Sequence, residues 1–409
     1  MPLNPWNSER SRDSNAIPNP EKRVIYLDAC ATAPLRPGVL QRMIETQDRA
    51  WANPSSLHGF GLKASEALER ARSQIAEKLR ADPRDVVFTS GATESIHLAL
   101  HGLAATRSPG RLVISSVEHP AVSGAAGLLS MSGWEVTEWP VDQLGRIRLE
   151  HLEELLAPPT QMVSLVWGQG EVGTIQPLLR VAEACRTRGI PIHTDATQVL
   201  SQGLPRWKQL PVDLLSASAH KSGGPRGIGL LMIRESHRSE LMPLLSGGGQ
   251  EGGLRSGTES VVLAAGMAAA LDQIECCAPA DLARSGHGVA DLRDALRERL
   301  LTDERLMICG DPENRLPHHL SLLVSDHSGQ PVSGRRLVRS LDACGLAVSS
   351  GSACSSGKDS DSPVLVAMGL PQSQCRSSVR LSLGPWIEPQ QLDEIVQRFQ
   401  AGLEQSLCS

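Results

Sequence analysis

Short apolar runs alternate with amphipathic segments from residue 85 to residue 233, and no other feature constrains the fold as strongly. The runs have the length of buried strands, and most end in small or polar residues. Strands that alternate with helices predict an α/β domain with a mainly parallel, doubly wound sheet, which binds ligands at the carboxyl ends of its strands. The expected strands are 24–27, 85–89, 112–115, 135–139, 162–167, 190–194, 212–216 and 228–233, and the expected helices are 39–50, 62–79, 95–105, 120–131, 149–156 and 178–188.

The pattern changes after the glycine-rich segment 246–258. A smaller α+β domain is predicted there, with a long helical region at 260–300, strands at 320–324, 347–349 and 379–383, and a helix at 333–343. The polar, proline-containing start of the chain is typical of a disordered or extended arm. We therefore expect an arm at 1–23, a large domain at 36–262, and a small domain built from 24–35 and 263–409.

Composition narrows the class of protein. The 409 residues carry a net charge of −5 with both signs spread along the chain, which is not the footprint of a nucleic-acid-binding protein. The apolar run 261–271 is too short to span a bilayer, and no signal peptide opens the chain. The nine cysteines show neither C-x-x-C pairs nor zinc-type spacing, so we expect reduced thiols, no resident metal and a cytoplasmic location.

Lys221 lies in the stretch 216–224, where small residues join two expected strands. By itself it fits a solvated surface lysine, but a lysine amine can also form a Schiff base when its surroundings lower its pKa. Pyridoxal phosphate requires such a lysine, an acid facing its pyridinium nitrogen, and a cup for its phosphate. Lys221, Asp195 and the turn 90–93 supply one each, although Asp195 and the turn also fit plain helix N-caps.

Cys354 is the single thiol in the loop 349–357, which otherwise consists of Ser, Gly and Ala. Free cysteines are usually buried, so a thiol in a polar loop is out of place as a structural residue. The functional interpretation is a mobile loop that presents a nucleophilic thiol.

Seven short motifs follow one another along the chain. They are YLD at 26–28, SGATES at 90–95, DATQ at 195–198, AHK at 219–221, RSGT at 255–258, SSGSAC at 349–354 and VRLSLG at 379–384. This order resembles that of the cysteine desulfurases, in particular the IscS/NifS-like group of the class V aminotransferase superfamily. The resemblance implies the pyridoxal-phosphate-dependent transferase fold of type I, with a mainly parallel seven-stranded sheet flanked by helices. It also implies a homodimer that converts L-cysteine to L-alanine.

The resemblance implies a role for each site residue. Lys221 would bind the cofactor covalently and later move the substrate Cα proton, while Asp195 would pair with the pyridinium nitrogen. His119 would stack on the ring and assist proton transfer, and Gln198 would bond to its phenolic oxygen. Cys354 would take up the sulfur as a persulfide. Arg380 would bind the substrate carboxylate. The phosphate of the cofactor would be bound by Ala92, Thr93, Ser218, His220 and, from the other subunit, Thr258.

The sulfur would serve iron–sulfur clusters or other sulfur-containing products. The implied partners are L-cysteine and a sulfur acceptor or iron–sulfur scaffold protein, which Cys354 would contact transiently; neither nucleic acid nor a membrane is expected. Two other hypotheses share Lys221 and Asp195. A selenocysteine lyase or a cystine or cysteine β-lyase would need no persulfide on Cys354, and a degenerate homologue would only regulate a true desulfurase.

The chain departs from the family pattern at one position. Where the family usually has Asn-Asn-Glu, this chain has Gln169, Gly170 and Glu171. Glycine has no side chain with which to contact cofactor and substrate, so a hydrogen bond worth about 0.5–1.5 kcal/mol is missing or is supplied by Gln169 or water. We expect slower turnover or altered substrate handling, without loss of the cofactor.

Overall fold

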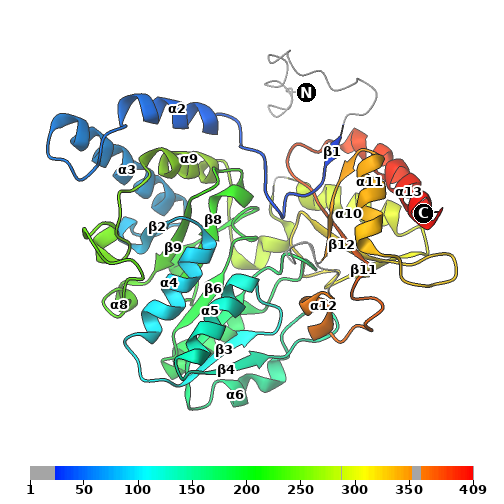
Figure 1. The fold of residues 1–409 in the computed structure, drawn as a ribbon, viewed down its shortest axis with the longest axis horizontal. Helices are drawn as coiled ribbons and strands as arrows, with labels where there is room; N and C mark the ends of the chain where they lie inside the picture. The colour runs from blue at the N-terminus through cyan, green and yellow to red at the C-terminus, as the bar shows by residue number, and fades with distance from the viewer. Residues whose placement is uncertain (1–23, 287, 352–360, 409) are drawn as a thin grey trace.

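The computed structural model describes residues 24–286, 288–351 and 361–408, which form a large and a small domain (Figure 1). The arm predicted at 1–23 lies outside these residues. The large domain contains a seven-stranded sheet with the order β2-β9-β8-β6-β5-β3-β4, in which only β9 runs antiparallel to its neighbours. The predicted mainly parallel α/β architecture is confirmed. The strands are β2 (Val86–Thr89), β3 (Arg111–Ser115), β4 (Glu135–Trp139), β5 (Thr160–Val166), β6 (Ile192–Asp195), β8 (Leu214–Ser218) and β9 (Gly229–Ile233).

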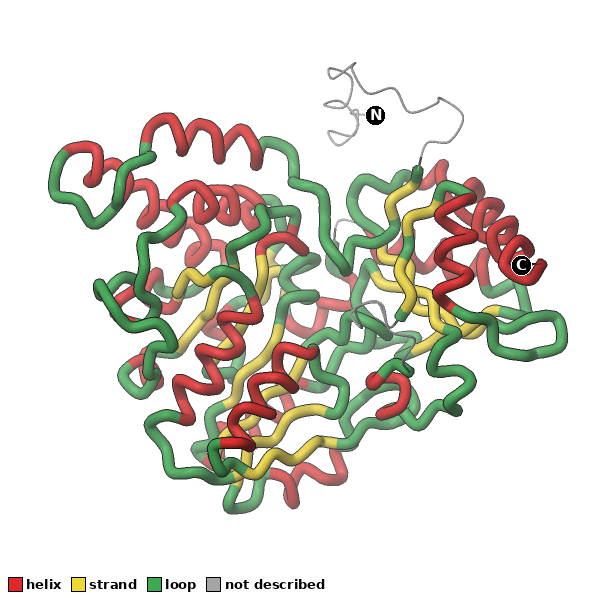
Figure 2. The backbone as a smooth tube through the Cα atoms, in the orientation of Figure 1, coloured by secondary structure: helices red, strands yellow, loops and turns green. Residues whose placement is uncertain are grey.

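Both faces of this sheet are buried, as Figure 2 shows by the helices on either side of the strands. Val86 and Phe88 of β2 join one hydrophobic cluster, whereas Val87 between them joins another. Successive side chains of a strand point to opposite faces, so the two clusters lie on opposite sides of the sheet. Helices α3, α7 and α9 contribute to the first cluster, and α4 and α5 contribute to the second. The helices of this domain are α2 (Val39–Arg49), α3 (Gly59–Lys78), α4 (Ala92–Ala104), α5 (Pro120–Met131), α6 (Leu152–Leu155), α7 (Leu178–Arg188), α8 (Glu235–Arg238) and α9 (Val261–Asp272).

The small domain is built on an antiparallel sheet with the order β11-β12-β15-β14. The first strand of the described chain, β1 (Ile25–Tyr26), pairs in parallel with β13 (Leu346–Ala347). The residues before α2 therefore pack with the C-terminal part of the chain (Figure 1). Ile25 and Leu27 belong to the separate hydrophobic cluster of this domain. Its other elements are β11 (Leu306–Cys309), β12 (His319–Val324), β14 (Ser349–Ser350), β15 (Ser378–Ser382), α10 (Val289–Leu300), α11 (Gly334–Ala343), α12 (Pro363–Ala367) and α13 (Leu392–Cys408).

The long helical region predicted at about 260–300 is interrupted, because α9 and α10 are separate helices. After α9 the chain forms β10 (Cys276–Cys277), which pairs with β7 (Leu204–Pro205), and then a 3₁₀ turn at Pro279–Arg284. Proline cannot continue a helix because it lacks an N–H group, and Gly286 has a φ of 93°, outside the helical range. α10 begins only after these residues.

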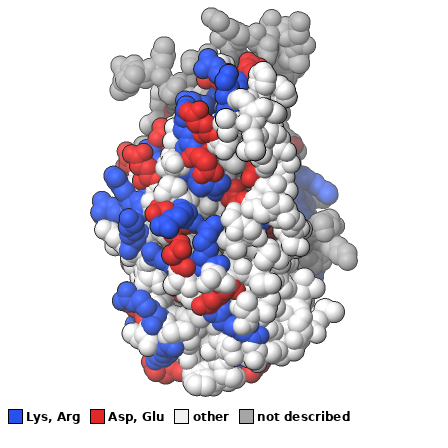
Figure 3. Space-filling model, turned by 90° about the vertical axis from the view of Figure 1, so that its left-hand side faces the viewer, with Lys and Arg blue, Asp and Glu red and all other residues white. Residues whose placement is uncertain are grey.

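The surface reflects the balanced composition. On the face that Figure 3 shows, Lys and Arg side chains intermingle with Asp and Glu, beside a broad area without charged side chains. Within the described residues, no helix is both long enough and apolar enough to cross a membrane.

Candidate active site

A cavity of about 390 Å³ lies at the carboxyl ends of β6 and β8, against the first turn of α4. This is the edge at which doubly wound sheets bind their ligands. Segments far apart in the sequence meet here, so the tertiary structure brings together most of the residues that the sequence singled out. The lining residues are Ser90, Gly91, Ala92, Thr93, Glu94, His119, Asp195, Thr197, Ser218, His220, Lys221, Arg226 and Gly227.

Lys221 lies on a 3₁₀ turn, Ala219–Ser222, directly after the buried strand β8. The turn ends at Gly223, whose φ of 76° is a left-handed conformation that favours glycine. A Cβ there would also lie 2.6 Å from the Cγ of Arg36. Arg36 in turn donates from Nε to the carbonyl of Ser222 at 2.8 Å. The turn that carries the lysine is therefore fixed by the strand on one side and by the N-terminal segment on the other.

Asp195 is the last residue of β6 and is 6% exposed. Its strand lies between β5 and β8, so the carboxylate projects from the interior of the sheet into the cavity. Oδ1 accepts a hydrogen bond from the N–H of Thr197 at 2.9 Å. A buried carboxylate costs free energy unless it also meets a cation, and a protonated pyridine nitrogen is such a cation. The position of Asp195 therefore fits its predicted partner.

The first turn of α4 lines the cavity and has no side-chain cap. The first N–H groups of a helix have no acceptor within the helix, and they attract anions such as phosphate. Glu94, in the same turn, accepts from the N–H of Ser90 at 2.7 Å and pairs with Arg255 at 2.8 Å. Burial opposes its ionisation, but these donors hold the pKa of Glu94 below its usual value. Because Arg255 neutralises this carboxylate, the helix end suits a phosphate group.

Two histidines of the cavity are neutral at pH 7. His119 caps α5, and its Nδ1 accepts from the N–H of Ala121 at 3.1 Å, so the neutral ring carries its proton on Nε2. Burial lowers the pKa of His119, an effect that Asp195 opposes and Lys221 reinforces. Burial and the charges of Lys221 and Arg226 lower the pKa of His220 to about 4. An uncharged, flat His119 ring beside Asp195 suits the predicted stacking on a cofactor ring.

Orphaned polar atoms beside Asp195 test whether the cofactor fits. The Oγ1 of Thr197 and the Oε1 of Gln198 are buried and have no hydrogen-bond partner among the described residues. Nε2 of Gln198 donates to the carbonyl of Cys30 at 3.0 Å, which orients the amide. Buried polar atoms are costly unless a partner satisfies them. Together with the acid, the amine and the helix end, they fit a polar, phosphorylated pyridine ring.

The structure does not place every predicted residue in the wall of this cavity. Arg380 projects from β15, where Nη2 pairs with Oδ1 of Asp28 at 2.8 Å and Nη1 donates to the carbonyl of Gly170 at 2.9 Å. Thr258 is exposed and lines no part of the cavity of its own chain. Cys354 lies outside the described residues, which resume at Asp361.

Gln169 does not replace the side chain that Gly170 lacks. Its Oε1 accepts from the N–H groups of Glu171, at 2.5 Å, and Val172, at 3.0 Å, and its Nε2 donates to the carbonyl of Val117 at 3.2 Å. Both ends of the Gln169 amide are therefore hydrogen-bonded to backbone groups. A Cβ at Gly170 would lie 2.9 Å from Nε2 of Gln198, so the position faces the predicted cofactor site.

Glu118 was missed by the sequence reasoning. It is buried beside His119, and its Oε1 accepts from the N–H of Val166 at 2.7 Å and from the hydroxyl of Ser115 at 2.8 Å. It thus joins the ends of β3 and β5 below the cavity. Burial, with a contribution from Asp195, raises the pKa of Glu118 to about 8 although the hydrogen bonds oppose the shift. The available signal was a carboxylate three residues after the end of an expected strand, next to a predicted functional histidine.

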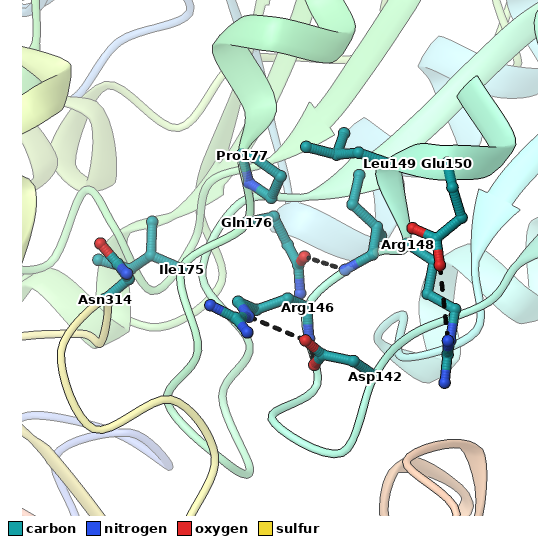
Figure 4. Close-up of a pocket in the computed structure, with 10 residues that line it drawn as sticks. Asp142, Arg146, Arg148, Leu149, Glu150, Ile175, Gln176, Pro177 and Asn314 are labelled. Atoms are coloured by element: carbon teal, nitrogen blue, oxygen red, sulfur yellow. Dashed lines mark hydrogen bonds and ion pairs between the residues drawn. The ribbon is translucent and has the colours of Figure 1, made fainter. Parts of the chain in front are cut away.

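A larger cavity of about 520 Å³ lies elsewhere, between the segment 142–150 and Asn314 (Figure 4). Its charged side chains are paired with one another, Arg146 with Asp142 at 3.0 Å and Arg148 with Glu150 at 3.5 Å. The residues that line it include neither a lysine nor a buried carboxylate. The smaller cavity therefore remains the candidate active site.

Comparison with known proteins agrees with this geometry. Residues 25–395 match the model of the family described as Aminotransferase class-V. The chain is 39% identical over 388 residues to "Cysteine desulfurase IscS" of Vibrio vulnificus (strain CMCP6), with 94% of this chain and 93% of the relative covered. It is 37% identical to "Cysteine desulfurase, mitochondrial" of Saccharomyces cerevisiae, with 91% and 74% covered.

Solved structures show the same fold. A "NIFS-LIKE PROTEIN" superposes with a TM-score of 0.82 at 32% identity and covers 92% of this chain and 98% of its own. A structure described as "SspA in complex with cysteine" superposes with a TM-score of 0.76 at 32% identity and covers 89% and 99%. The similarity therefore extends over both domains.

Proposed function

The chain belongs to the class V aminotransferase family and, within it, to the cysteine desulfurases, and we propose that it converts L-cysteine to L-alanine and takes up the sulfur on Cys354 as a persulfide. As a member of this family it is an enzyme that uses pyridoxal 5′-phosphate. One observation carries the proposal for the site: Lys221, Asp195 and the first turn of α4 surround a single cavity.

The residues of the cavity have separate tasks in this proposal. Bound pyridoxal phosphate withdraws electrons from the substrate and so makes its Cα–H bond acidic. Lys221 would hold the cofactor through its amine, and the same amine would move the Cα proton of the substrate. Asp195 keeps a positive charge on the ring nitrogen. His119, neutral and protonated on Nε2, lines the cavity where it would stack on the ring, and it could transfer a proton from that atom.

The phosphate and the remaining polar groups hold the cofactor in one orientation. The N–H groups of Ala92 and Thr93 at the helix start would bind the phosphate together with the hydroxyl of Ser218 and the ring of His220, all of which line the cavity. Gln198 would bond to the phenolic oxygen, and Arg380 would bind the substrate carboxylate.

Sulfur transfer requires a thiolate. In the proposed step the Cys354 sulfur attacks the Sγ atom of the substrate, an S–S bond forms, and the Cβ–Sγ bond breaks. The electron pair of the broken bond returns to the substrate carbon, which takes a proton and becomes the methyl group of alanine. Cys354 is left with one additional sulfur atom as a persulfide, ready for transfer to an acceptor. No external oxidant is needed.

We further propose a homodimer in which Thr258 completes the phosphate site of the partner. Thr258 is exposed, and the cavity of its own chain does not include it. Large apolar side chains are exposed on α2, in the loop between α2 and α3, and at the start of α3, and exposed apolar patches mark interaction sites. Trp51 and Phe60 contact each other there, with ring centroids 5.6 Å apart, and remain 61% and 57% exposed. The other exposed apolar residues of this region are Leu40, Ile44, Leu57 and Leu62.

The sulfur acceptor is proposed to be an iron–sulfur scaffold or another protein that accepts sulfur. Relatives named cysteine desulfurase IscS support this assignment by family. The eight cysteines of the described residues are all free thiols, which supports a location in the reducing cytoplasm.

Mass spectrometry of the holoenzyme after incubation with L-cysteine tests the proposed function. We expect one added sulfur on the peptide that contains Cys354, together with release of alanine. A Cys354→Ser variant should keep the visible absorbance of the bound cofactor and lose persulfide formation. Sulfide release that persists in this variant would indicate a β-lyase, and absence of the visible absorbance from the wild-type protein would indicate a homologue without catalytic function.

A further inference from the structure

The guanidinium of Arg380 is held in place by Asp28 and by the carbonyl of Gly170. Its side chain is 7% exposed, and both terminal nitrogens have partners, Asp28 on Nη2 and the carbonyl of Gly170 on Nη1. That carbonyl also lies 3.2 Å from Nε2 of His319, a neutral, buried ring. Nε of Arg380 is buried and has no partner among residues 24–286, 288–351 and 361–408.

Asp28 connects this guanidinium to two other segments. Its Oδ1 pairs with Arg380 at 2.8 Å, and its Oδ2 accepts from the hydroxyl of Ser349 at 2.8 Å. Ser349 itself lies opposite Arg380 in the ladder between β14 and β15. The backbone of Asp28 bridges to Ser382 of β15. Ser349 thus orients one oxygen of the carboxylate, and the other oxygen contacts the arginine.

These contacts occupy one N–H on each terminal nitrogen of Arg380, so Nε–H and a second N–H on each terminal nitrogen are left to bind a ligand. An arginine side chain loses considerable rotamer freedom when it is confined, and a rigid partner reduces that cost at the moment of binding. A guanidinium recognises a carboxylate through two parallel N–H groups, and the unpartnered Nε–H supplies one of them. An orphaned donor in this buried position points to an anionic ligand.

We propose that Asp28 is a positioning residue for substrate recognition: it holds Arg380 so that Nε–H and a second N–H meet the α-carboxylate of the amino-acid substrate. This inference rests on the proposed function only in taking an α-amino acid as the substrate. Ser349 orients Asp28, and the carbonyl of Gly170 supports the guanidinium from the other terminal nitrogen.

The negative charge of Asp28 does not itself favour binding of the substrate carboxylate. A carboxylate next to the guanidinium weakens its attraction for a second carboxylate, so the charge by itself opposes substrate binding. An amide at the same position still accepts from Arg380 and contacts Ser349, without the repulsion. In Asp28→Ala, loss of the geometry should weaken substrate binding, whereas loss of the charge alone would strengthen it. In Asp28→Asn the geometry is kept and only the charge is lost, so neither effect weakens binding.

Titration of the holoenzyme, followed by the visible absorbance of its cofactor, separates these effects. L-Alanine carries the α-carboxylate, and ethylamine is the matched probe that lacks it. For Asp28→Ala we expect about tenfold weaker binding of L-alanine and binding of ethylamine within about twofold of wild type, since one charge-assisted contact is lost. For Asp28→Asn we expect L-alanine to bind within about threefold of wild type or more tightly.

Three results would overturn the inference: wild-type affinity of Asp28→Ala for L-alanine, equal weakening for L-alanine and ethylamine, or equal losses in the Asn and Ala variants. Equal weakening for both ligands would mean that Asp28 only stabilises the fold around the cofactor. These titrations measure binding without desulfuration. A wild-type enzyme that binds L-alanine but forms no persulfide would refute the proposed function and leave the role of Asp28 standing.

Discussion

A buried ion pair anchors the glycine-rich segment that carries Arg255 and Thr258. The Nη1 and Nη2 atoms of Arg72, on α3, donate to the two carboxylate oxygens of Glu251 at 2.7 Å each. The N–H of Phe88 donates to Oε2 of Glu251 at 2.8 Å, and the arginine stacks on the Phe88 ring, 4.8 Å from its centroid. The Glu251 side chain is 1% exposed and that of Arg72 is 10% exposed. We predict that Glu251→Gln strongly destabilises the protein.

The magnitude follows from what remains around the arginine. Removing one partner of a buried ion pair costs about 3–5 kcal/mol, because an uncompensated charge stays buried. Glu69 also contacts Arg72, at 3.1 Å, but its side chain is 56% exposed, so it compensates only in part. Glutamine keeps an acceptor for the N–H of Phe88. We therefore expect a loss near the lower end of the range, about 3 kcal/mol.

Urea unfolding, followed by tryptophan fluorescence, measures the loss as a change in the free energy of unfolding. Glu69→Gln is the matched control, because it removes the exposed partner of the same arginine, and it should cost less than about 1 kcal/mol. Adding Arg72→Met to Glu251→Gln removes the buried cation and should recover part of the loss. Equal effects of Glu251→Gln and Glu69→Gln would refute the assignment of a buried, uncompensated charge.

Two further predictions concern the active site. The pKa of Glu118 in the folded protein, about 8, lies above the ordinary value of 4.5, so between these values the folded state holds a proton that the unfolded chain has released and stability falls as pH rises. In Glu118→Gln this loss between pH 5 and pH 8 should be smaller in urea unfolding, and an unchanged pH profile would contradict the assignment. Gly170→Asn should raise kcat/KM for L-cysteine about twofold to tenfold by supplying the missing amide, after a small shift of Gln198, in steady-state assays of alanine release. Gly170→Ala, which adds a Cβ without the amide, should give no gain, and equal kinetics of the two variants would count against the prediction.

The order of elements in the large domain was predictable because its signals are local. Strands such as β3 and β8 are short apolar runs, and their alternation with amphipathic helices requires only the two side-chain periodicities. Lys221, Asp195 and the start of α4 were also predictable as a set, because residues at the carboxyl ends of parallel strands meet at one edge of the sheet. The interruption of the helical region 260–300 was not predictable, because its cause is not local. The apolar residues of this region allow a helix, but pairing of β10 with the distant β7 and the break at Pro279 override the local pattern.

The sequence by itself thus determined the architecture and the cofactor chemistry, and it predicted the residues that would carry this chemistry. Only the tertiary structure decided which carboxylates pair with the buried cations of Arg380 and Arg72, because these partners lie far away in the sequence. Asp28 meets Arg380 across 352 positions of the chain, and Arg72 meets Glu251 across 179. The hydrophobic periodicity of the sequence does not indicate such pairs. They form because a buried charge must find an opposite charge or a donor wherever the fold places one.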